Sequence, residues 1–508
     1  MTVRSTSSGH DGRARTTTKR FLGVLCLAVV LVRLTYLPRP LRNDEGGYLL
    51  VARHWHTGGE FLYGDYFVDR PPLLLLLFKV AALTEWDQAI RALAIPFVVL
   101  FVLAGWHAGR LLGGDAGGRW AAVVAAGLLC SPGLAADQAD GELFGAVLVM
   151  VALALALTAW HADPPGSAGW WAAGAGAAAA AAPLVKQNLL EGVLFLAGLV
   201  LFTRWGRDET ARRRALLVAS AAAAGALVVC ALAGLWLASS AVEPAAAWRD
   251  LVGFRGAALD AIWSSNPDAT IRRGAQLLVL GVVGGLLPVV VVWLLGARRD
   301  LAQGSPEGRT ITALVLFGVA AITAGGSFWP AYLLQLAPAA VLAVAVVAPR
   351  ATVAGAWMRG CSRVVVGAAA LGTTVAVVLH ASVPSLWAGQ RVGEWLADSK
   401  APSDTGVVAY GLPSVLETAD MSSPYPHLWS VPMRTADPDQ ARLRATLAGP
   451  RAPAWIVQVT ALDAWHIDDG ARLRDLVHDR YRVVATICGY RVWLRQDLTR
   501  ELSAPPSC

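Results

Sequence analysis

The sequence predicts an all-α polytopic membrane protein with a small α/β domain at its C-terminal end. Of the 508 residues, 56% are hydrophobic and only 16% are charged, whereas a water-soluble protein carries roughly 25% charged residues. Apolar runs of about 18 residues or more, long enough to cross a bilayer, recur up to residue 382. The residues that follow are more polar and show the shorter patterns of strands and amphipathic helices.

The N-terminal part is expected to be a cytoplasmic segment followed by a membrane anchor. Residues 1–20 are polar and basic, which predicts disorder. The apolar run 21–38 is not followed by a small-residue cleavage site, so we expect an uncleaved anchor; a cleaved signal peptide is the alternative. A transmembrane domain with about eleven spans is expected over 21–382. The other spans lie near 89–112, 119–135, 142–160, 169–185, 189–203, 214–240, 274–296, 310–325, 331–348 and 363–382.

The distribution of arginine predicts which loops lie outside. The apolar stretch 71–84 is short and contains Lys79, so it is not counted as a span. With the N-terminus inside, three arginine-rich loops then face the cytoplasm, as the positive-inside rule requires; counting 71–84 would place all three outside. These loops are 203–214, 296–309 and 348–363. The same arrangement places the 39–88 loop, the 135–143 loop and the tail 383–508 outside.

The 39–88 loop carries the most specific local pattern. Asp44 and Glu45 stand side by side soon after the first span, although a segment flanking a bilayer does not need two adjacent carboxylates. They precede an amphipathic stretch, 47–57, and then "GGEFLYGDYFVDRPPLLLLL". We expect 47–57 and the proline-initiated 71–84 to form short helices at the outer membrane surface. The 135–143 loop supplies a second acidic group, which comprises Asp137, Asp140 and Glu142.

This combination resembles the GT-C membrane glycosyltransferases, in particular the branch with dolichyl-phosphate-mannose protein mannosyltransferases and bacterial lipid A aminoarabinose transferases. The family pattern has an acidic pair after the first span, then G-x-x-L-Y-x-D-x-F-x-x-(K/R/H)-P-P-L, then acidic residues after the third span. The matching pieces are Asp44–Glu45, residues 59–65, Arg70 to Leu73, and Asp137, Asp140 and Glu142. "PLVKQNLL" (183–190) and "GGSFWPAYLLQLAP" (325–338) resemble two further family segments. The similarity covers most of 21–350, and Arg70 stands where relatives often carry Lys or His.

The resemblance implies transfer of a sugar from a polyprenyl-phosphate carrier to a glycan, glycolipid or protein acceptor, on the outer face of the plasma membrane. An acceptor hydroxyl is a weak nucleophile until a carboxylate takes its proton. We expect Asp44 to be this base, with Glu45 as a helper. The alternative interpretation of Asp44 is a helix N-cap.

The departing lipid phosphate needs cations that stabilise its negative charge. Lys186 is the first candidate, because it lies at the outer end of an Ala-rich span; snorkelling to the interface is the alternative. Arg70 is the second candidate and Arg255 the third.

The remaining candidates line the expected site. Asp137, Asp140 and Glu142 are expected to orient the acceptor or to bind a divalent cation together with Asp44; oxygen ligands would favour Mg or Mn. The alternative is a loop that is polar only because it lies outside lipid. The expected substrate-lining residues are Tyr63, Asp65, Tyr66, Trp329 and Tyr332. An aromatic belt at the membrane interface also explains the aromatic members.

The tail is expected to be a small α/β domain on the acceptor side. Its predicted helices are 389–400, 437–449 and 469–481, and its predicted strands are 406–411, 453–459, 482–487 and 490–495. The segment 410–430 follows the first strand, where open α/β sheets usually bind ligands. No tail residue is singled out as catalytic. Cys488 and Cys508 would pair outside the cytoplasm; two unpaired thiols are the alternative.

Two other functions compete with glycosyl transfer. A lipid-linked-sugar transporter or flippase would carry charged residues near mid-span, often in two corresponding halves. Here the spans are nearly free of charge, the acidic residues lie at span ends and no repeat is evident. A non-catalytic scaffold is the third reading, and it predicts no effect of Asp44→Asn. The net charge of +7 indicates loop topology rather than a nucleic-acid partner. The sequence contains no phosphate-cradling P-loop or dinucleotide fingerprint.

Overall fold

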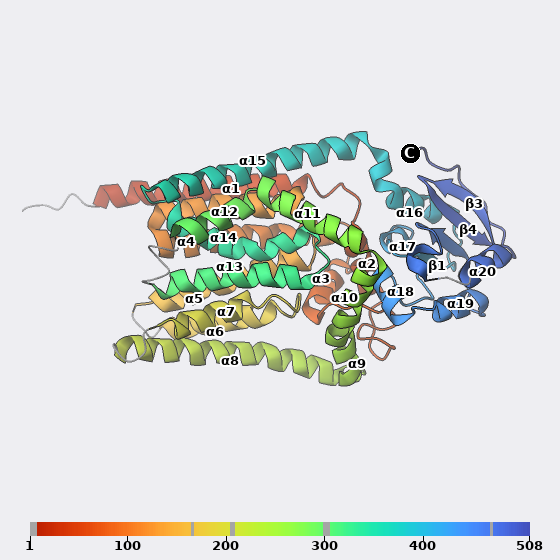
Figure 1. Ribbon diagram of the computed structural model, residues 1–508, viewed down its shortest axis with the longest axis horizontal. Helices are drawn as coiled ribbons and strands as arrows, with labels where there is room; N and C mark the ends of the chain where they lie inside the picture. Colours follow the sequence, from red (N-terminus) through yellow and green to blue (C-terminus); the bar gives the residue numbers. More distant parts are fainter. Residues whose placement is uncertain (1–7, 164–166, 204–208, 298–304, 468–470) are drawn as a thin grey trace, which may run out of the picture.

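A computed structural model of the chain describes residues 8–163, 167–203, 209–297, 305–467 and 471–508. The molecule is elongated: helices run along its long axis, and the C-terminal domain sits on one end of this bundle (Figure 1). We call this end the tail end. The strands of the described residues lie in one small sheet near the C-terminus, as the sequence predicts.

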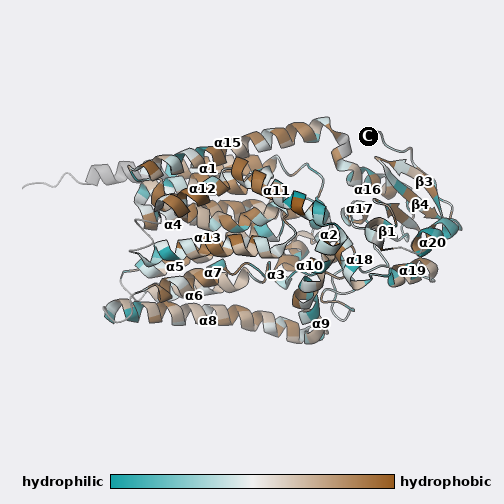
Figure 2. Ribbon diagram, in the orientation of Figure 1, coloured by the Kyte–Doolittle hydropathy of each residue, from teal (hydrophilic) through white to brown (hydrophobic). Residues whose placement is uncertain are grey.

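The bundle helices correspond to the expected spans. Six of the described helices are long and apolar enough to cross a membrane, and α11 with α12, bent by 72°, would make a seventh. Apolar residues predominate along them (Figure 2). Helix length and composition therefore do not establish the expected number of about eleven spans. The bundle contains α1 (Ser8–Leu34), α4 (Ala89–Leu129), α5 (Gly141–His161), α6 (Ala168–Ala181), α7 (Glu191–Leu201), α8 (Glu209–Ser239), α11 (Pro267–Val283), α12 (Leu286–Val292), η4 (Trp293–Ala297), α13 (Pro306–Gly325), η5 (Pro330–Leu336), α14 (Ala337–Val347) and α15 (Val353–Ser382).

The helix α4 contains two antiparallel segments that turn at Gly113–Gly114. Gly114 has φ 63° and ψ −165°, a backbone conformation open to glycine and costly for other residues. The two segments pack closely, because a Cβ on Gly109 would lie 2.6 Å from the Cβ of Ala121. The two stretches expected as spans at 89–112 and 119–135 thus form one helical hairpin.

Several short helices gather at the tail end of the bundle (Figure 1). They are α2 (Asn43–Arg53), α3 (Pro72–Ala81), η1 (Pro132–Leu134), α9 (Pro244–Trp248), η3 (Arg249–Gly253) and α10 (Phe254–Ser265). The helices α8, α13 and α15, each of which follows an arginine-rich loop, begin at the opposite end (Figure 1). The 39–88 loop and the tail therefore share one end of the bundle, and the helices that follow the arginine-rich loops begin at the other.

The C-terminal domain holds a four-stranded sheet of order β1-β2-β4-β3. β1 is parallel to β2, and β4 is antiparallel to both β2 and β3. Cys488 at the β3–β4 turn forms a disulfide with Cys508, with Cα atoms 5.4 Å apart. The elements are η6 (Pro384–Trp387), α16 (Ala388–Ser399), β1 (Gly406–Ala409), α17 (Ser414–Thr418), α18 (Ser430–Ala436), α19 (Ala441–Ala448), β2 (Trp455–Gln458), η7 (Ala464–His466), α20 (Arg472–Arg480), β3 (Tyr481–Ile487) and β4 (Tyr490–Arg495).

One N-terminal element differs from the sequence-based expectation. The helix α1 begins at Ser8, inside the segment expected to be disordered; residues 1–7 lie outside the described part of the chain. The helix α2 forms as a short helix, as expected, and its residues 45–52 are buried against neighbours that include α3 and α17 of the tail. A Cβ on Gly47 would lie 2.3 Å from the Trp429 side chain, so the glycine permits the tail to approach α2 this closely.

Candidate active site

Asp44 lies in the first turn of α2, partly buried beneath the C-terminal domain. Its Oδ1 accepts a hydrogen bond of 2.9 Å from the indole Nε1 of Trp429, a tail residue. Burial raises the pKa of the Asp44 carboxyl above its ordinary value, although Arg70 and the Trp429 hydrogen bond both act to lower it. A carboxylate whose charge is disfavoured in this way is suited to accept a proton.

Glu45, the next residue, is fully buried and makes contacts of a different kind. Arg91 donates to its two oxygens at 2.8 and 2.5 Å. The backbone N–H groups of Arg42 and Ala139 donate to it at 2.9 and 2.8 Å. Burial alone would raise the pKa of Glu45, but Arg91 and these hydrogen bonds hold it below its ordinary value. The contacts favour a positioning role over the expected helper base, since Glu45 fixes the start of α2 to the 135–143 loop.

The second acidic group is divided between two places. Asp140 caps α5, with Oδ1 accepting from the Leu143 N–H at 3.0 Å, and Glu142 forms an ion pair with Lys186. Burial, then the charge of Glu142, raises the pKa of Asp140 well above its ordinary value, and Asp44 is close enough to add to the effect. Asp140 and Glu142 therefore lie close to Asp44, and Glu142 also contacts Lys186.

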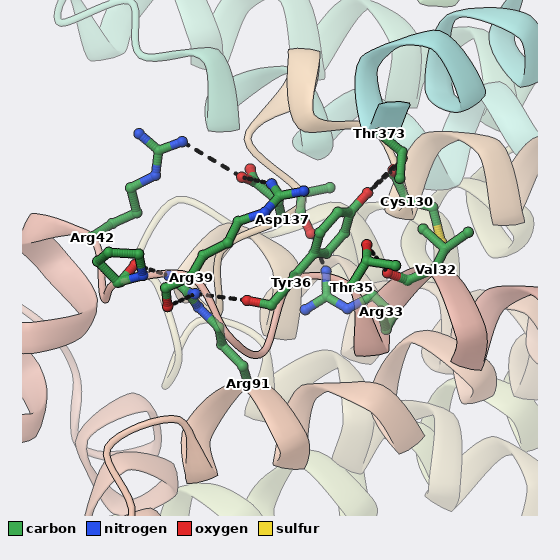
Figure 3. A network of polar contacts seen from close by, with 12 residues as sticks. Val32, Arg33, Thr35, Tyr36, Arg39, Arg42, Arg91, Cys130, Asp137 and Thr373 are labelled. Atoms are coloured by element: carbon green, nitrogen blue, oxygen red, sulfur yellow. Dashed lines mark hydrogen bonds and ion pairs between the residues drawn. The ribbon is translucent and has the colours of Figure 1, made fainter. Parts of the chain in front are cut away.

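Asp137, the third member, faces a different set of partners. Its Oδ2 lies 3.4 Å from Arg39 Nη1 and 3.5 Å from Arg42 Nη2 (Figure 3). Arg39 also stacks on the ring of Tyr36, at 4.6 Å from Cζ to the ring centroid. Asp137 thus neutralises arginines that hold the chain after α1, and its contacts do not favour the expected role in acceptor or metal binding.

Two of the three cationic candidates, Arg70 and Arg255, contact Asp69, a residue that the sequence did not single out. Asp69 Oδ1 lies 2.6 Å from Arg70 Nη1, and Oδ2 lies 3.2 Å from Arg255 Nη2. Burial alone would raise the pKa of Asp69, but the two guanidinium groups hold it below its ordinary value. Gln187 ties this group to the 183–190 segment, donating to the Asp69 carbonyl at 2.8 Å and accepting from Arg255 at 3.2 Å.

Lys186 is buried, with 5% of its surface exposed. Its Nζ contacts Glu142 and lies 4.2 Å from the centroid of the Tyr332 ring. A lysine that snorkels would place its ammonium in water, so these contacts argue against that alternative. We call Asp44, Asp69, Arg70, Asp140, Glu142, Lys186 and Arg255 the Asp44 cluster.

The donor set of the cluster does not fit a divalent cation. In the part of the chain that the structure describes, no group of three or more His, Cys, Asp or Glu side chains could hold one. The carboxylate of Glu142 is engaged by Lys186 and that of Asp69 by two arginines, and Asp140 caps a helix. We therefore derive no chemical step through Mg or Mn.

The residues expected to line the substrate differ in their contacts and in their exposure. Tyr63 donates to the Arg70 carbonyl at 2.5 Å, which fixes the backbone of the cluster. Tyr66 accepts from the Ser423 N–H at 2.9 Å and so joins the loop to the tail. Asp65 is exposed and faces His56. Trp329 is half exposed and lies over Arg273. Tyr332 contacts a charged side chain of the cluster, the ammonium group of Lys186.

Trp429 is the functional candidate that sequence reasoning missed. It lies in the 410–430 segment after β1, which was noted for its aromatic residues and its place at a strand end. The sequence did not indicate that this segment reaches α2. The glycines at 46 and 47 are the available signal, because they follow the acidic pair and open α2 to a close neighbour.

Comparisons with known proteins give a fold but no sequence family. No family model matches the chain, and no curated protein matches it. Solved structures do match. ArnT from Cupriavidus metallidurans bound to undecaprenyl phosphate is 18% identical, with a TM-score of 0.59 over 92% of this chain and 97% of that chain. The apo state of ArnT gives 18% identity and a TM-score of 0.60 over 94% and 98%.

An archaeal oligosaccharyltransferase is also similar. The Archaeoglobus fulgidus enzyme, in a complex with Zn and sulfate, is 14% identical with a TM-score of 0.54 over 85% of this chain and 67% of that chain. The same protein, named AglB, in complex with an inhibitory peptide and a dolichol-phosphate gives 12% identity and a TM-score of 0.52 over 88% and 69%. ArnT and AglB have the GT-C fold. The chain therefore has this fold, as its motifs predict.

Proposed function

We propose that the protein transfers a sugar from a polyprenyl-phosphate donor to an acceptor hydroxyl, with inversion at the anomeric carbon. One observation carries the proposal: Asp44, a carboxylate with a raised pKa, lies close to Arg70 and to Glu142, the ion-pair partner of Lys186, at one end of a GT-C bundle. A base and cations for a leaving phosphate are what such a reaction needs. The similar ArnT structure holds undecaprenyl phosphate, which supports a lipid-linked donor.

In the proposed step, Asp44 takes the proton of the acceptor hydroxyl as its oxygen attacks the anomeric carbon. Trp429 holds one carboxylate oxygen, so the carboxylate is oriented while its second oxygen receives the proton. The new bond joins the acceptor oxygen to the sugar, and the bond from the sugar to the phosphate oxygen breaks. The lipid phosphate keeps the electron pair and departs as an anion.

The departing phosphate is stabilised by the cations of the Asp44 cluster. Asp69 holds Arg70 and Arg255 on its two oxygens, so both guanidinium groups are oriented before a donor binds. Lys186 is the third cation, between Glu142 and the Tyr332 ring. Phosphate oxygens can take the place of carboxylate partners, because they accept the same charge-assisted hydrogen bonds.

We further propose a plasma-membrane location, with the 1–20 segment inside, the transmembrane domain over 21–382 and the 383–508 domain outside. The helices that follow the arginine-rich loops begin at the end of the bundle opposite the tail (Figure 1), which agrees with the positive-inside rule. The disulfide between Cys488 and Cys508 is typical of an oxidising compartment. The transporter alternative is less favoured, because the Asp44 cluster lies at one end of the bundle and not at mid-span.

The experiment incubates membranes containing the protein with labelled polyprenyl-phosphate sugars and follows label in the products. Asp44→Asn keeps the size of the side chain but removes the base, and we expect transfer to fall about 10²–10⁴-fold. Glu85→Gln, a change at an exposed carboxylate of the same loop, is the matched control and is expected to be neutral. Equal transfer by wild type and Asp44→Asn would show that Asp44 is not the base.

A further inference from the structure

A cavity of about 640 Å³ lies between the bundle and the C-terminal domain. This volume is within the range of about 300–1,000 Å³ typical of small-molecule sites. The loop around 59–67, the segment 241–257 and the tail each contribute to its wall. We propose that this cavity binds the acceptor and that the acceptor is an uncharged glycan. The inference rests on the proposed glycosyl transfer and deepens it by naming the acceptor class.

Three phenyl rings form the apolar part of the cavity wall. The ring centroids of Phe67 and Phe254 are 4.8 Å apart, and those of Phe61 and Phe67 are 5.7 Å apart. The face of an aromatic ring is electron-rich and attracts the polarised C–H bonds on one side of a sugar ring. Phe61 and Phe67 are almost fully buried, so Phe254, the most exposed of the three rings, is the one suited to pack against the apolar face of a sugar.

Two buried polar side chains of the wall have atoms without a partner among the described residues. Asp250 is 1% exposed; its Oδ1 accepts from Arg249 at 3.1 Å, and its Oδ2 accepts from no described group. His427 is 3% exposed, and its Nδ1 is likewise unbonded. Burial, then the nearby Arg442, lowers the pKa of His427 to about 4, so the ring is neutral at physiological pH.

These two groups favour hydroxyls as ligands. Buried polar atoms are nearly always hydrogen-bonded, so the free oxygen and nitrogen indicate partners supplied by a ligand. A carboxylate oxygen accepts from a hydroxyl, and a neutral imidazole either donates to a hydroxyl or accepts from it. A glycan offers such hydroxyls along its whole length.

The cavity wall carries a small excess of negative charge. Glu60 accepts two hydrogen bonds of 2.6 Å from Arg442, and Asp250 pairs with Arg249. Glu243, an exposed residue of the same wall, is a third carboxylate, so three carboxylates stand against two guanidinium groups, and the neutral His427 adds no charge. Such a wall disfavours an anionic ligand, such as a multiply phosphorylated glycolipid. Among glycans, an uncharged one is favoured for this reason.

The cavity also adjoins the Asp44 cluster. Three chain segments each place one residue in the cavity wall and another, one or two positions away, in or against the cluster. The pairs are Phe67 with Asp69, Phe254 with Arg255, and His427 with Trp429, the hydrogen-bond donor to Asp44. A glycan held by the wall can therefore present a terminal hydroxyl to Asp44.

The test measures binding of the detergent-purified full chain to an array of defined oligosaccharides. Each neutral oligosaccharide is paired with a phosphorylated or uronic-acid form. We expect binding to neutral members, with affinity at least tenfold lower in Asp250→Asn and in Phe254→Ala. Asp260→Asn, an exposed carboxylate on α10, is the control and is expected to bind as wild type does. Asp250→Asn is isosteric, so a failure of Phe254→Ala to fold would leave a variant that decides the result.

The outcomes separate this inference from the proposed reaction. Preferred binding of anionic glycans, an absence of glycan binding, or equal affinity in wild type and Asp250→Asn would overturn the inference. Asp44→Asn is expected to bind glycans like wild type, because it changes the base and not the cavity wall. If Asp250→Asn and Phe254→Ala transfer sugar at the wild-type rate, only the proposed acceptor site is contradicted. If the protein binds glycans but transfers no sugar to them, the proposed reaction is contradicted instead.

Discussion

Two groups of charged residues lie at the tail end of the bundle: the Asp44 cluster, and a group formed by Glu45 and Arg91. The adjacent residues Asp44 and Glu45 therefore belong to different groups. Glu45 is fully buried, and Arg91 and two backbone N–H groups occupy its oxygens. Asp44 has one hydrogen bond, from Trp429, and a raised pKa. The environment, not the residue type or the position in the sequence, separates a carboxylate that holds the fold from one suited to take a proton.

The cations of the two groups differ in the same way. Arg91 donates to the carbonyls of Tyr36, Arg39 and Pro40 as well as to Glu45, so its donors fix the backbone after α1. The side-chain partners of Lys186 and Arg70 are carboxylates of the Asp44 cluster and aromatic rings. An anionic ligand can replace such partners without unfolding a loop. The group around Arg91 is therefore expected to set stability, and the Asp44 cluster to set activity.

The largest expected effect is the loss of stability on removing Arg91. Arg91→Ala leaves Glu45 buried without its counter-ion, which costs about 3–5 kcal/mol in the free energy of unfolding. Thermal unfolding of the detergent-purified protein measures the effect. Arg110→Ala, on the same helix but exposed, is the control. An unchanged unfolding temperature for Arg91→Ala would contradict the expectation that the group around Arg91 sets stability.

Lys186→Met is expected to reduce transfer about 10²–10³-fold, because it removes one cation from the developing phosphate charge. Lys186→Arg should restore part of the rate, since it returns the positive charge. Transfer assays with the labelled donor measure both variants, and unfolding temperatures show whether each remains folded. A normal rate in Lys186→Met would assign the lysine to structure alone.

Acidification is expected to remove activity before stability. Asp44 must be deprotonated to act, so the rate is full above its raised pKa and falls about tenfold for each pH unit below it. Glu45 has a lowered pKa, so its stabilising effect is full above its unfolded pKa of about 4.3 and is lost only as the pH falls through the lower folded value. A pH–rate profile and unfolding temperatures over the same range test this order. Coincident midpoints would contradict it.

Trp429→Phe is expected to have the smallest effect of the four. It removes one hydrogen bond, worth about 1 kcal/mol, or about fivefold in rate. Because that hydrogen bond lowers the pKa of Asp44, its loss should also move the acid limb of the pH–rate profile to higher pH. Trp86→Phe, at an exposed tryptophan of the 39–88 loop, is the control. An acid limb in the wild-type position would show that the indole does not act on Asp44.

The bundle was predictable because apolar length and arginine placement are local signals. The same signals predict that Asp44, Asp140 and Lys186 share one end of the bundle, since sidedness fixes which loops lie together. The burial of α2 was not predictable, because an apolar helix face looks the same whether lipid or protein covers it. Trp429 could not be identified for a related reason. A tryptophan in a small domain usually belongs to its core, and no local signal indicates that it reaches another domain.

The hydrogen bond between Asp44 and Trp429 also determines how early during protein synthesis the site can form. The two residues are 385 positions apart in the chain. A ribosome that adds about 5–20 residues per second needs roughly 20–80 seconds to make the intervening polypeptide. During that interval the N-terminal helices can enter the bilayer while Asp44 still lacks its indole partner. The hydrogen bond can form only after synthesis has passed residue 429, and a chain that ends before this residue lacks it.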